Sequence, residues 1–206
     1  MKLLIATSNE GKLREVREIL GPILLEGTPP HELVSLADLK LPAPEEDGET
    51  FEQNAAIKAR ASAMASGLWT LADDSGICVD ALGGAPGIRS ARYADSDQAR
   101  RGKLLQVLAD VPVTRRGAHF FCAVALSSPD GRRLFRAEGQ VLGTIASAGR
   151  GTNGFGYDPI FVPTEVPAQT LAEMPQAEKN RLSHRGRALA RLAPVLKRLL
   201  HDGDLR

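Results

Sequence analysis

The pattern of apolar and polar positions predicts strands and helices in alternation from the start of the chain. Residues 2–6 hold a continuous apolar run, which is typical of a buried strand, and a polar turn follows. Apolar residues then recur at helical spacing over 13–20, and Gly21-Pro22 is expected to end that helix. A second strand is expected within residues 32–41.

The next third of the chain predicts a helix followed by two strands. Thr50 is a suitable N-cap, and Gln53 three residues later completes a capping box. The Ala-rich segment that follows is expected to stay helical as far as Gly67, a good C-terminal stop. Residues 70–81 then indicate two strands joined by a polar turn at 73–76.

The second half continues in the same mixed style. The expected elements are, in order, a helix capped by Ser96 and ending near Asp110, a strand over 119–126, a turn over 128–131, a strand over 133–141, irregular backbone over 149–156, a short strand over 159–162, and a final helix with apolar positions from Leu182 to Leu199 that is kinked or restarted at Pro194. This mixture predicts an α/β or α+β core, and the length suits one large domain spanning residues 1–206 or two closely packed lobes.

Composition narrows the class of protein. The 206 residues are 43% hydrophobic and 25% charged, which is ordinary for a globular chain that buries its own core. The net charge of +1 gives no reason to expect a nucleic-acid partner. No segment approaches the ~20 apolar residues needed to cross a bilayer, so no membrane is expected either. Cys78 and Cys122 lie in apolar segments and suggest buried thiols, which favours a cytoplasmic location.

Three polar segments carry candidate chemistry. The first comprises Thr7, Ser8, Asn9, Glu10, Gly11 and Lys12, at the expected start of a helix. Exposed N–H groups at a helix N-terminus, hydroxyls and a lysine make an anion site. It is not a P-loop, because Ala6 replaces the first glycine and Leu13 follows the lysine. A capped surface helix with a solvated lysine fits the same residues about equally well.

The second segment is the acidic pair Asp73-Asp74. Two adjacent carboxylates between apolar strand ends are costly unless something positive compensates them, and Mg²⁺ prefers carboxylate and phosphate oxygens. One carboxylate could also accept a proton from water. A plain β-turn explains the pair as well. Asn54 and Lys58 share one helix face, where Lys58 is either a phosphate contact or a surface lysine lying along apolar side chains.

The third segment lies towards the C-terminus. Glycines beside Phe155 and Tyr157 allow the backbone to approach a flat ligand while the rings stack on it, although a loop around a core aromatic has the same composition. Lys179, His184 and Arg185 place basic groups at or before a helix start, where acids are usual. Cations at that position suggest an anionic or acceptor-rich ligand.

Taken together, these segments resemble one known family over almost the whole chain. The motifs that carry the resemblance are Thr7-Ser8-Asn9-Glu10-Gly11-Lys12, Phe51-Glu52-Gln53-Asn54-Ala55, Ala72-Asp73-Asp74-Ser75-Gly76, Gly83-Gly84-Ala85-Pro86-Gly87-Ile88, Ser90-Ala91-Arg92-Tyr93, Gly154-Phe155-Gly156-Tyr157-Asp158-Pro159 and Ser183-His184-Arg185-Gly186. Their order and types resemble the inosine triphosphate pyrophosphatase (Ham1-like) family. Any one motif is weak, whereas all of them in sequence are specific.

The resemblance implies an activity and a fold. Enzymes of this family hydrolyse ITP, dITP and XTP, the triphosphates of deaminated purines, to the monophosphate and pyrophosphate. They need Mg²⁺ and are usually homodimers. The implied fold is a two-lobed α/β structure with a long mixed central sheet flanked by helices and an active site in the cleft between the lobes.

The resemblance also assigns roles by position. It implies that Thr7, Ser8, Asn9, Glu10, Gly11 and Lys12 hold the triphosphate, with Asn54 and Lys58 as helpers on the phosphate side. Asp74 is the implied catalytic acid, which binds metal and accepts a proton from water, and Glu45, next to Glu46, is the second metal ligand. Ser75 is expected to contact the substrate. The base is expected to be framed by Phe155, Gly156, Tyr157, Asp158, Lys179, His184 and Arg185.

Two alternatives remain open at this stage. A related Maf-like pyrophosphatase would act on pyrimidine or methylated nucleotides. A nucleotide- or RNA-binding module without catalysis would use the basic final helix and bind in a salt-sensitive manner. The near-neutral charge and the acidic pair both count against that second alternative.

Overall fold

The computed structural model describes residues 2–25 and 30–201 and confirms an α/β fold built on one mixed sheet. The strands are β1 (Lys2–Ile5), β2 (Glu32–Ser35), β3 (Trp69–Val79), β4 (Gly117–Ser127), β5 (Leu134–Ile145) and β6 (Phe161–Pro163). The helices are α1 (Glu10–Leu25), α2 (Phe51–Ser66), α3 (Asp97–Val107), α4 (Gln176–Leu182) and α5 (His184–His201). The strand order is β2-β1-β3-β4-β5-β6, where β1 runs parallel to β2 and β3 while β6 is antiparallel to β5.

The described chain divides into two compact units. Unit 1 holds residues 2–25, 30–74, 122–139 and 185–201, and unit 2 holds residues 75–121 and 140–184. Strands β3, β4 and β5 each contribute residues to both units. The predicted single domain and the predicted cleft between lobes stay predictions.

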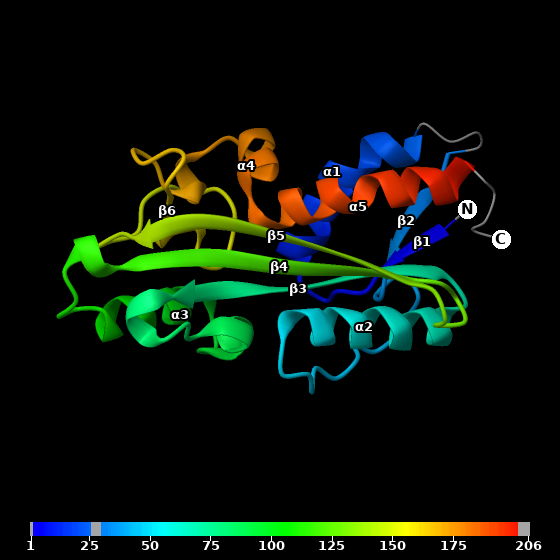
Figure 1. Ribbon diagram of the computed structural model, residues 1–206, viewed down its shortest axis with the longest axis horizontal. Helices are drawn as coiled ribbons and strands as arrows, with labels where there is room; N and C mark the ends of the chain where they lie inside the picture. The colour runs from blue at the N-terminus through cyan, green and yellow to red at the C-terminus, as the bar shows by residue number, and fades with distance from the viewer. Residues whose placement is uncertain (1, 26–29, 202–206) are drawn as a thin grey trace. The chain divides into compact units, whose positions relative to one another are not determined.

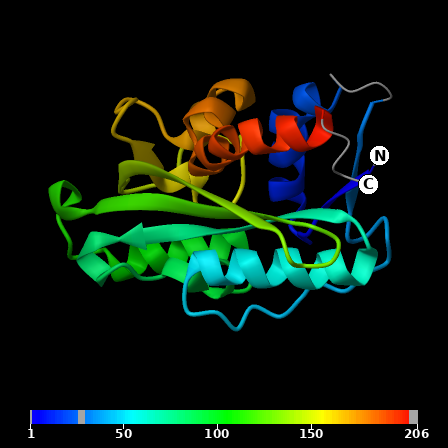
Figure 2. The ribbon, with the colours of Figure 1, turned by 45° about the vertical axis from the view of Figure 1, so that its right-hand side comes forward.

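In unit 1, helices cover the sheet on both faces. Figures 1 and 2 show α1 and α5 on one face and α2 on the other. The core under α1 and α5 is built from alternate strand residues, including Leu3 and Ile5 of β1 and Trp69 and Leu71 of β3. Burial of that apolar surface is the main force holding the two helices to the sheet.

Helix α2 begins and ends where the sequence predicts. The Thr50 side chain accepts a hydrogen bond from Gln53 N at 3.2 Å, and Gly67 ends the helix with a left-handed φ of 67°. The capping box is only half formed, because the Gln53 side chain accepts instead from Glu49 N at 2.7 Å. The alanines of α2, among them Ala55, Ala59 and Ala63, are buried.

Unit 2 has its own core. Ile77 of β3, Phe120 of β4, Val141 of β5 and Phe161 of β6 are buried together with Leu104 of α3. Helix α3 starts at the predicted cap, where the Ser96 hydroxyl accepts from Ala99 N at 3.1 Å. Figures 1 and 2 show α3 and α4 on opposite sides of the strands of this unit.

Two predictions about helices are wrong. Gly21-Pro22 does not end the first helix, which continues to Leu25 with Pro22 inside it. An interior proline costs about 3 kcal/mol, and here the burial of Leu20 and Leu24 on either side offsets that cost. The final helix was expected to include Leu182, which instead ends α4, whereas α5 starts at His184. Helix α5 passes through Pro194 as one element.

The predicted strand, turn and strand over 70–81 is also wrong. Residues 69–79 form one continuous strand, and Asp73-Asp74 lie in its interior. Composition favours a turn for Asp-Asp-Ser-Gly, but compensating cations allow buried carboxylates to stay in a strand. Smaller differences are the length of β2, which ends at Ser35, and the 159–162 segment, where the 3₁₀ turn Asp158–Ile160 precedes β6.

The strands predicted over 119–126 and 133–141, the turn between them and the irregular 149–156 segment are confirmed. No helix within the described residues is sufficiently long and apolar to cross a membrane.

Candidate active site

The acidic pair on β3 is divided between the two faces of the sheet. Successive side chains of a strand point to opposite faces, so Asp73 follows Trp69 and Leu71 towards α1 and α5, while Asp74 points towards α2. Both carboxylates are buried, with 4% and 5% of each residue exposed. Their partners therefore decide what each can do.

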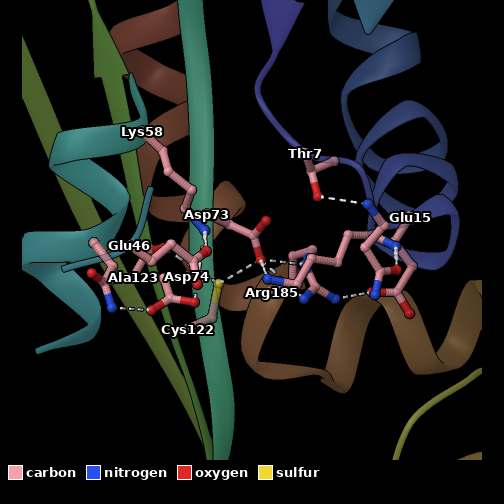
Figure 3. Close-up of polar contacts among 12 residues, drawn as sticks. Thr7, Glu15, Glu46, Lys58, Asp73, Asp74, Cys122, Ala123 and Arg185 are labelled. Carbon is pink, nitrogen blue, oxygen red and sulfur yellow. Dashed lines mark hydrogen bonds and ion pairs between the residues drawn. The ribbon is translucent and has the colours of Figure 1, made fainter. Parts of the chain in front are cut away.

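Asp73 is enclosed by cations. Its Oδ2 lies 3.0 Å from Lys12 Nζ and accepts from Arg185 Nε at 3.1 Å and Nη2 at 3.0 Å. Arg185 also donates to Glu15 of α1, and Cys122 Sγ lies 4.0 Å from Asp73 Oδ2 (Figure 3). Burial alone would raise the pKa of Asp73, but Lys12 and Arg185 outweigh it and hold that pKa well below its usual range. Asp73 is thus a permanent anion within an ion network.

Asp74 has a different environment. Its Oδ2 accepts from Asn54 Nδ2 at 3.0 Å, and its Oδ1 lies 3.7 Å from Lys58 Nζ. Burial raises the pKa of Asp74 despite the opposing charge of Lys58. A carboxylate with a raised pKa is a better proton acceptor near neutral pH than an ordinary one, so Asp74 has the character of a general base.

Helix α2 supplies the partners of Asp74. Asn54 is fully buried, and its Oδ1 accepts from Gly48 N at 2.9 Å. A Cβ on Gly48 would lie 2.7 Å from Asn54 Oδ1, so this close approach requires glycine. Lys58 Nζ forms an ion pair with Glu46 Oε1 at 2.5 Å. The surface-lysine interpretation of Lys58 is wrong, because its residue is only 7% exposed and its charge is paired with acids.

The acidic loop presents Glu46 rather than Glu45 to these groups. Glu45 is exposed, whereas Glu46 is partly buried against Lys58 (Figure 3). Glu46 and Asp74 thus share one cation, the Lys58 ammonium. Two carboxylates together with substrate phosphates are a usual ligand set for Mg²⁺, so the residues present fit that ion. No cluster of three or more His, Cys, Asp or Glu side chains suited to a metal occurs within residues 2–25 and 30–201.

The Thr7 to Lys12 segment forms the capped start of α1. Asn9 Oδ1 accepts from Lys12 N at 3.0 Å, and Asn9 N donates to Thr7 Oγ1 at 3.2 Å. Ser8, Asn9 and Glu10 are exposed, and Gly11 is partly exposed. Lys12 is not a solvated lysine: 14% of its side chain is exposed and its charge faces Asp73. A helix N-terminus and a fixed lysine thus lie together in unit 1, as an anion site requires.

In unit 2, Asp158 and Lys179 organise the glycine-rich loop. Asp158 Oδ2 accepts from Phe155 N at 2.8 Å and from Lys179 Nζ at 2.5 Å. Lys179 Nζ also lies 5.0 Å from the centroid of the Phe155 ring. Tyr157 was expected to frame the base, but it is 5% exposed and its hydroxyl donates to Ser90 O at 2.9 Å. Tyr157 is therefore a core residue, and the partly buried Phe155 is the aromatic ring available at the loop.

The remaining expected base contacts are divided between the units. His184 belongs to unit 2, where its ring stacks on Phe120 with centroids 4.6 Å apart and an interplanar angle of 6°. Ser75 also belongs to unit 2 and is partly exposed. Arg185 belongs to unit 1, where it is 1% exposed and committed to Asp73 and Glu15. Those two carboxylates explain why a cation, Arg185, lies in the first turn of α5, where acidic residues are usual.

Sequence reasoning did not single out Glu15. It is 2% exposed and accepts from the Arg185 guanidinium, and it extends the ion network to the second turn of α1. The apolar pattern of α1 offered no signal for it, because at 3.6 residues per turn Glu15 lies away from the stripe of Leu13, Val16 and Leu20. Its burial follows from the contact with Arg185, which is distant in sequence.

Comparisons with known proteins identify the family of this chain. The model of the Ham1 family matches residues 3–195. The chain is 49% identical to a dITP/XTP pyrophosphatase of Streptomyces coelicolor over 97% of this chain and 98% of that protein, and 50% identical to one of Geobacter sulfurreducens over 93% and 94%. It resembles the structure of a HAM1 protein from Coxiella burnetii with a TM-score of 0.82 and 39% identity, covering 96% of this chain and 99% of that one. The chain belongs to the Ham1 family.

Proposed function

We propose that this protein hydrolyses the triphosphates of deaminated purines, ITP, dITP and XTP, to the monophosphate and pyrophosphate. The observation that carries the proposal is Asp74, a buried carboxylate held by Asn54 beside Lys58 and Glu46. Near-complete coverage of relatives named dITP/XTP pyrophosphatases supports the substrate class.

The residues of unit 1 supply the chemistry of phosphate cleavage. Asp74 accepts the proton of the attacking water, and Asn54 fixes the orientation of its carboxylate. Lys12, Lys58 and the N–H groups at the start of α1 stabilise the charge that grows on the leaving pyrophosphate. Asp73 holds Lys12 in place, since the two lie 3.0 Å apart.

We propose Mg²⁺ as the cofactor, with Asp74 and Glu46 as the residues that would hold it. When bound, Mg²⁺ neutralises charge on the phosphate oxygens. Lys58 contacts both carboxylates, which supports this choice, because the pair already attracts a cation. We assign Glu46 in preference to the expected Glu45 because Glu45 is exposed.

Residues of unit 2 are proposed to recognise the base. Phe155 offers a ring for stacking, and Lys179 and His184 offer N–H donors. N–H donors can hydrogen-bond to the 6-oxo group of hypoxanthine or xanthine, which is an acceptor. The 6-amino group of adenine is itself a donor, so it cannot accept a hydrogen bond from them. Recognition by donors therefore favours deaminated purines over adenine.

The test is release of pyrophosphate from purified protein with Mg²⁺ across ITP, dITP, XTP, ATP, GTP and dTTP. We expect ITP, dITP and XTP to be hydrolysed far faster than ATP or GTP, with the monophosphate as the second product. Release of single phosphate, or equal rates on all purines, would refute the proposal. Preference for dTTP would instead favour the Maf-like alternative.

We further propose that the protein works in the cytoplasm as a homodimer. The family resemblance of the sequence motifs supports the dimer. The thiols of Cys78 and Cys122, which form no disulfide, support a reducing compartment. Light scattering coupled to size-exclusion chromatography tests the dimer, which requires twice the 22.0 kDa mass of one chain.

A further inference from the structure

The first turns of α3 bind both backbone polar groups of one residue, Gly156, in the glycine-rich loop of unit 2. Asp97 Oδ2 accepts from Gly156 N at 2.7 Å, and Arg101 Nη1 donates to Gly156 O at 2.7 Å. One residue of the loop is thus held through both of its backbone polar groups. Asp97 and Arg101 are one helical turn apart, so a single face of α3 makes both contacts.

Gly156 is a position that needs this support. Its φ is +60°, and a Cβ built on it would meet nothing within 4 Å. Glycine is therefore required here for the backbone conformation and not for space. Because glycine has more conformational freedom than any other residue, the peptide would sample other conformations if α3 did not hold it.

The neighbouring residues are held from a different element. Asp158 accepts from Phe155 N, and Lys179 of α4 donates to the same carboxylate oxygen. Phe155 therefore has its own N–H bound on one side and the following residue bound by α3 on the other. Its ring position depends on both anchors.

The Asp97 side chain is itself held in place. Arg100 donates to Asp97 and to Ala91 O, and Ser96 caps α3, the helix that carries Asp97 and Arg100. Burial tends to raise the pKa of Asp97, but the hydrogen bonds from Arg100 and Gly156 N lower it overall. Asp97 thus meets the loop as a charged acceptor, and such hydrogen bonds are stronger than neutral ones.

We propose that Asp97 and Arg101 are positioning residues that hold the Phe155 loop ready to receive the nucleobase. This inference rests on the proposed function, in which that loop contacts the base. Holding the loop before the substrate arrives removes an ordering cost from binding. Loss of the hydrogen bonds from Asp97 and Arg101 to Gly156 should weaken binding of the base without weakening binding of the triphosphate.

The test compares ligands with and without a base. In Asp97→Ala and Arg101→Met, we expect KM for ITP and Ki for IMP to rise about tenfold, as for loss of one hydrogen bond to a charged group. Ki for inorganic tripolyphosphate, which has no base, and kcat at saturating ITP should stay within about twofold of wild type. Asp97→Asn keeps an acceptor for Gly156 N and should recover most of the affinity for IMP.

Asp110→Ala is the matched control, because Asp110 is an exposed acid just beyond the other end of α3, and it should leave all four constants unchanged. A purely structural role predicts equal loss of IMP and tripolyphosphate binding with a lower Tm, and that result would overturn the inference. An unchanged Ki for IMP in both Asp97→Ala and Arg101→Met would also overturn it. If Asp97→Ala does not fold, Arg101→Met alone decides, since its long side-chain stem is kept.

Failure of the proposed function and failure of the positioning role of Asp97 and Arg101 give different results. If the wild-type protein releases no pyrophosphate from ITP, the proposed function fails and the inference falls with it. If the wild type is active and the variants bind IMP normally, only the inference fails. Hydrogen exchange at Gly156 gives a further readout without substrate, and it should speed up in Asp97→Ala but not in Asp110→Ala.

Discussion

Arg185 donates to one oxygen of Asp73 from two nitrogens, Nε at 3.1 Å and Nη2 at 3.0 Å. That oxygen also faces Lys12 Nζ at 3.0 Å, so it is surrounded by positive charge. An oxygen so engaged has little capacity left for a metal ion or a water proton. The two adjacent aspartates therefore differ in role: Asp73 organises cations, and Asp74 is left for chemistry.

Asp73→Asn should destabilise the fold strongly. It leaves the buried Arg185 without its main counter-charge, and breaking a buried ion pair in this way costs about 3–5 kcal/mol. The free energy of unfolding in urea measures the loss. Glu32→Gln is the control, because its pair with Lys2 is solvent-exposed and worth about 0–1 kcal/mol. Equal stability of the two variants would contradict the network.

The contribution of Asp73 to stability should depend on pH. The pKa of Asp73 is lower in the folded protein than in the unfolded chain, where it is about 3.9. The unfolded state therefore takes up the proton first as pH falls, so the stabilisation is complete above about pH 4 and is lost progressively below it. The difference in unfolding free energy between wild type and Asp73→Asn should thus be constant from pH 5 to 8 and shrink below pH 4. A constant difference down to pH 2 would contradict this linkage.

Asp74→Asn should separate activity from stability. Because burial raises the pKa of Asp74, the fold disfavours its charged form, and a neutral amide of the same shape should cost little stability. Loss of a general base lowers turnover by about 10²–10⁴-fold. Pyrophosphate release from ITP and thermal unfolding of the same sample check both statements. Full activity would place the base on another residue.

Substitutions in the acidic loop distinguish the two candidate metal ligands. Glu46→Gln should raise the Mg²⁺ concentration needed for half-maximal activity, because Glu46 lies with Asp74 around Lys58. Glu45→Gln should leave that concentration unchanged, because Glu45 is exposed. Titration of activity with Mg²⁺ at saturating ITP gives both values. The reverse result would restore Glu45 as the ligand.

Local signals predicted the helix caps and most strands of this chain. Thr50, Ser96 and Gly67 each act through neighbouring residues, and all three positions are confirmed. The continuous β3 could not be predicted, because what keeps Asp73 and Asp74 in a strand comes from cations distant in sequence: Lys12, Lys58 and Arg185. The helix through Pro22 escaped prediction for a similar reason, since the burial of Leu24 is a tertiary effect.

The candidate site could likewise be predicted from the sequence only in part. Residue types and order identified the family and nearly all the polar residues that the structure gathers around Asp73, Asp74 and Asp158. They did not indicate that Tyr157 turns into the core or that Arg185 is enclosed by acids. Side-chain direction depends on strand alternation and packing, which a motif does not encode.

The Cys122 thiol should be inert in the folded protein. It is fully buried beside Asp73, and burial raises its pKa to about 12. The thiolate is the reactive form, and a raised pKa leaves little of it near neutral pH. In a Cys78→Ala background, we expect no reaction with a thiol reagent until denaturant unfolds the chain. Rapid labelling of the native protein would show that the site opens readily.

Gly154→Ala should damage the base loop through the Asp158–Lys179 ion pair. A Cβ on Gly154 would lie 2.1 Å from Asp158 Oδ2 and 2.7 Å from Lys179 Nζ, and φ there is +73°. Because Asp158 and Lys179 are both buried and 2.5 Å apart, the clash must part them. The matched control is Gly83→Ala, at φ +59° with nothing within 4 Å of its Cβ, which incurs only the left-handed backbone cost of about 1–2 kcal/mol.

Gly154→Ala should therefore lose about 1–3 kcal/mol more stability than Gly83→Ala, as expected for overpacking. It should also raise KM for ITP, because Phe155 loses the anchor that Asp158 gives to its N–H group. Urea unfolding and steady-state kinetics on the two variants measure these effects. Equal stability and equal KM would show that Asp158 and Lys179 can move aside without consequence, and would remove the basis for assigning them to the base loop.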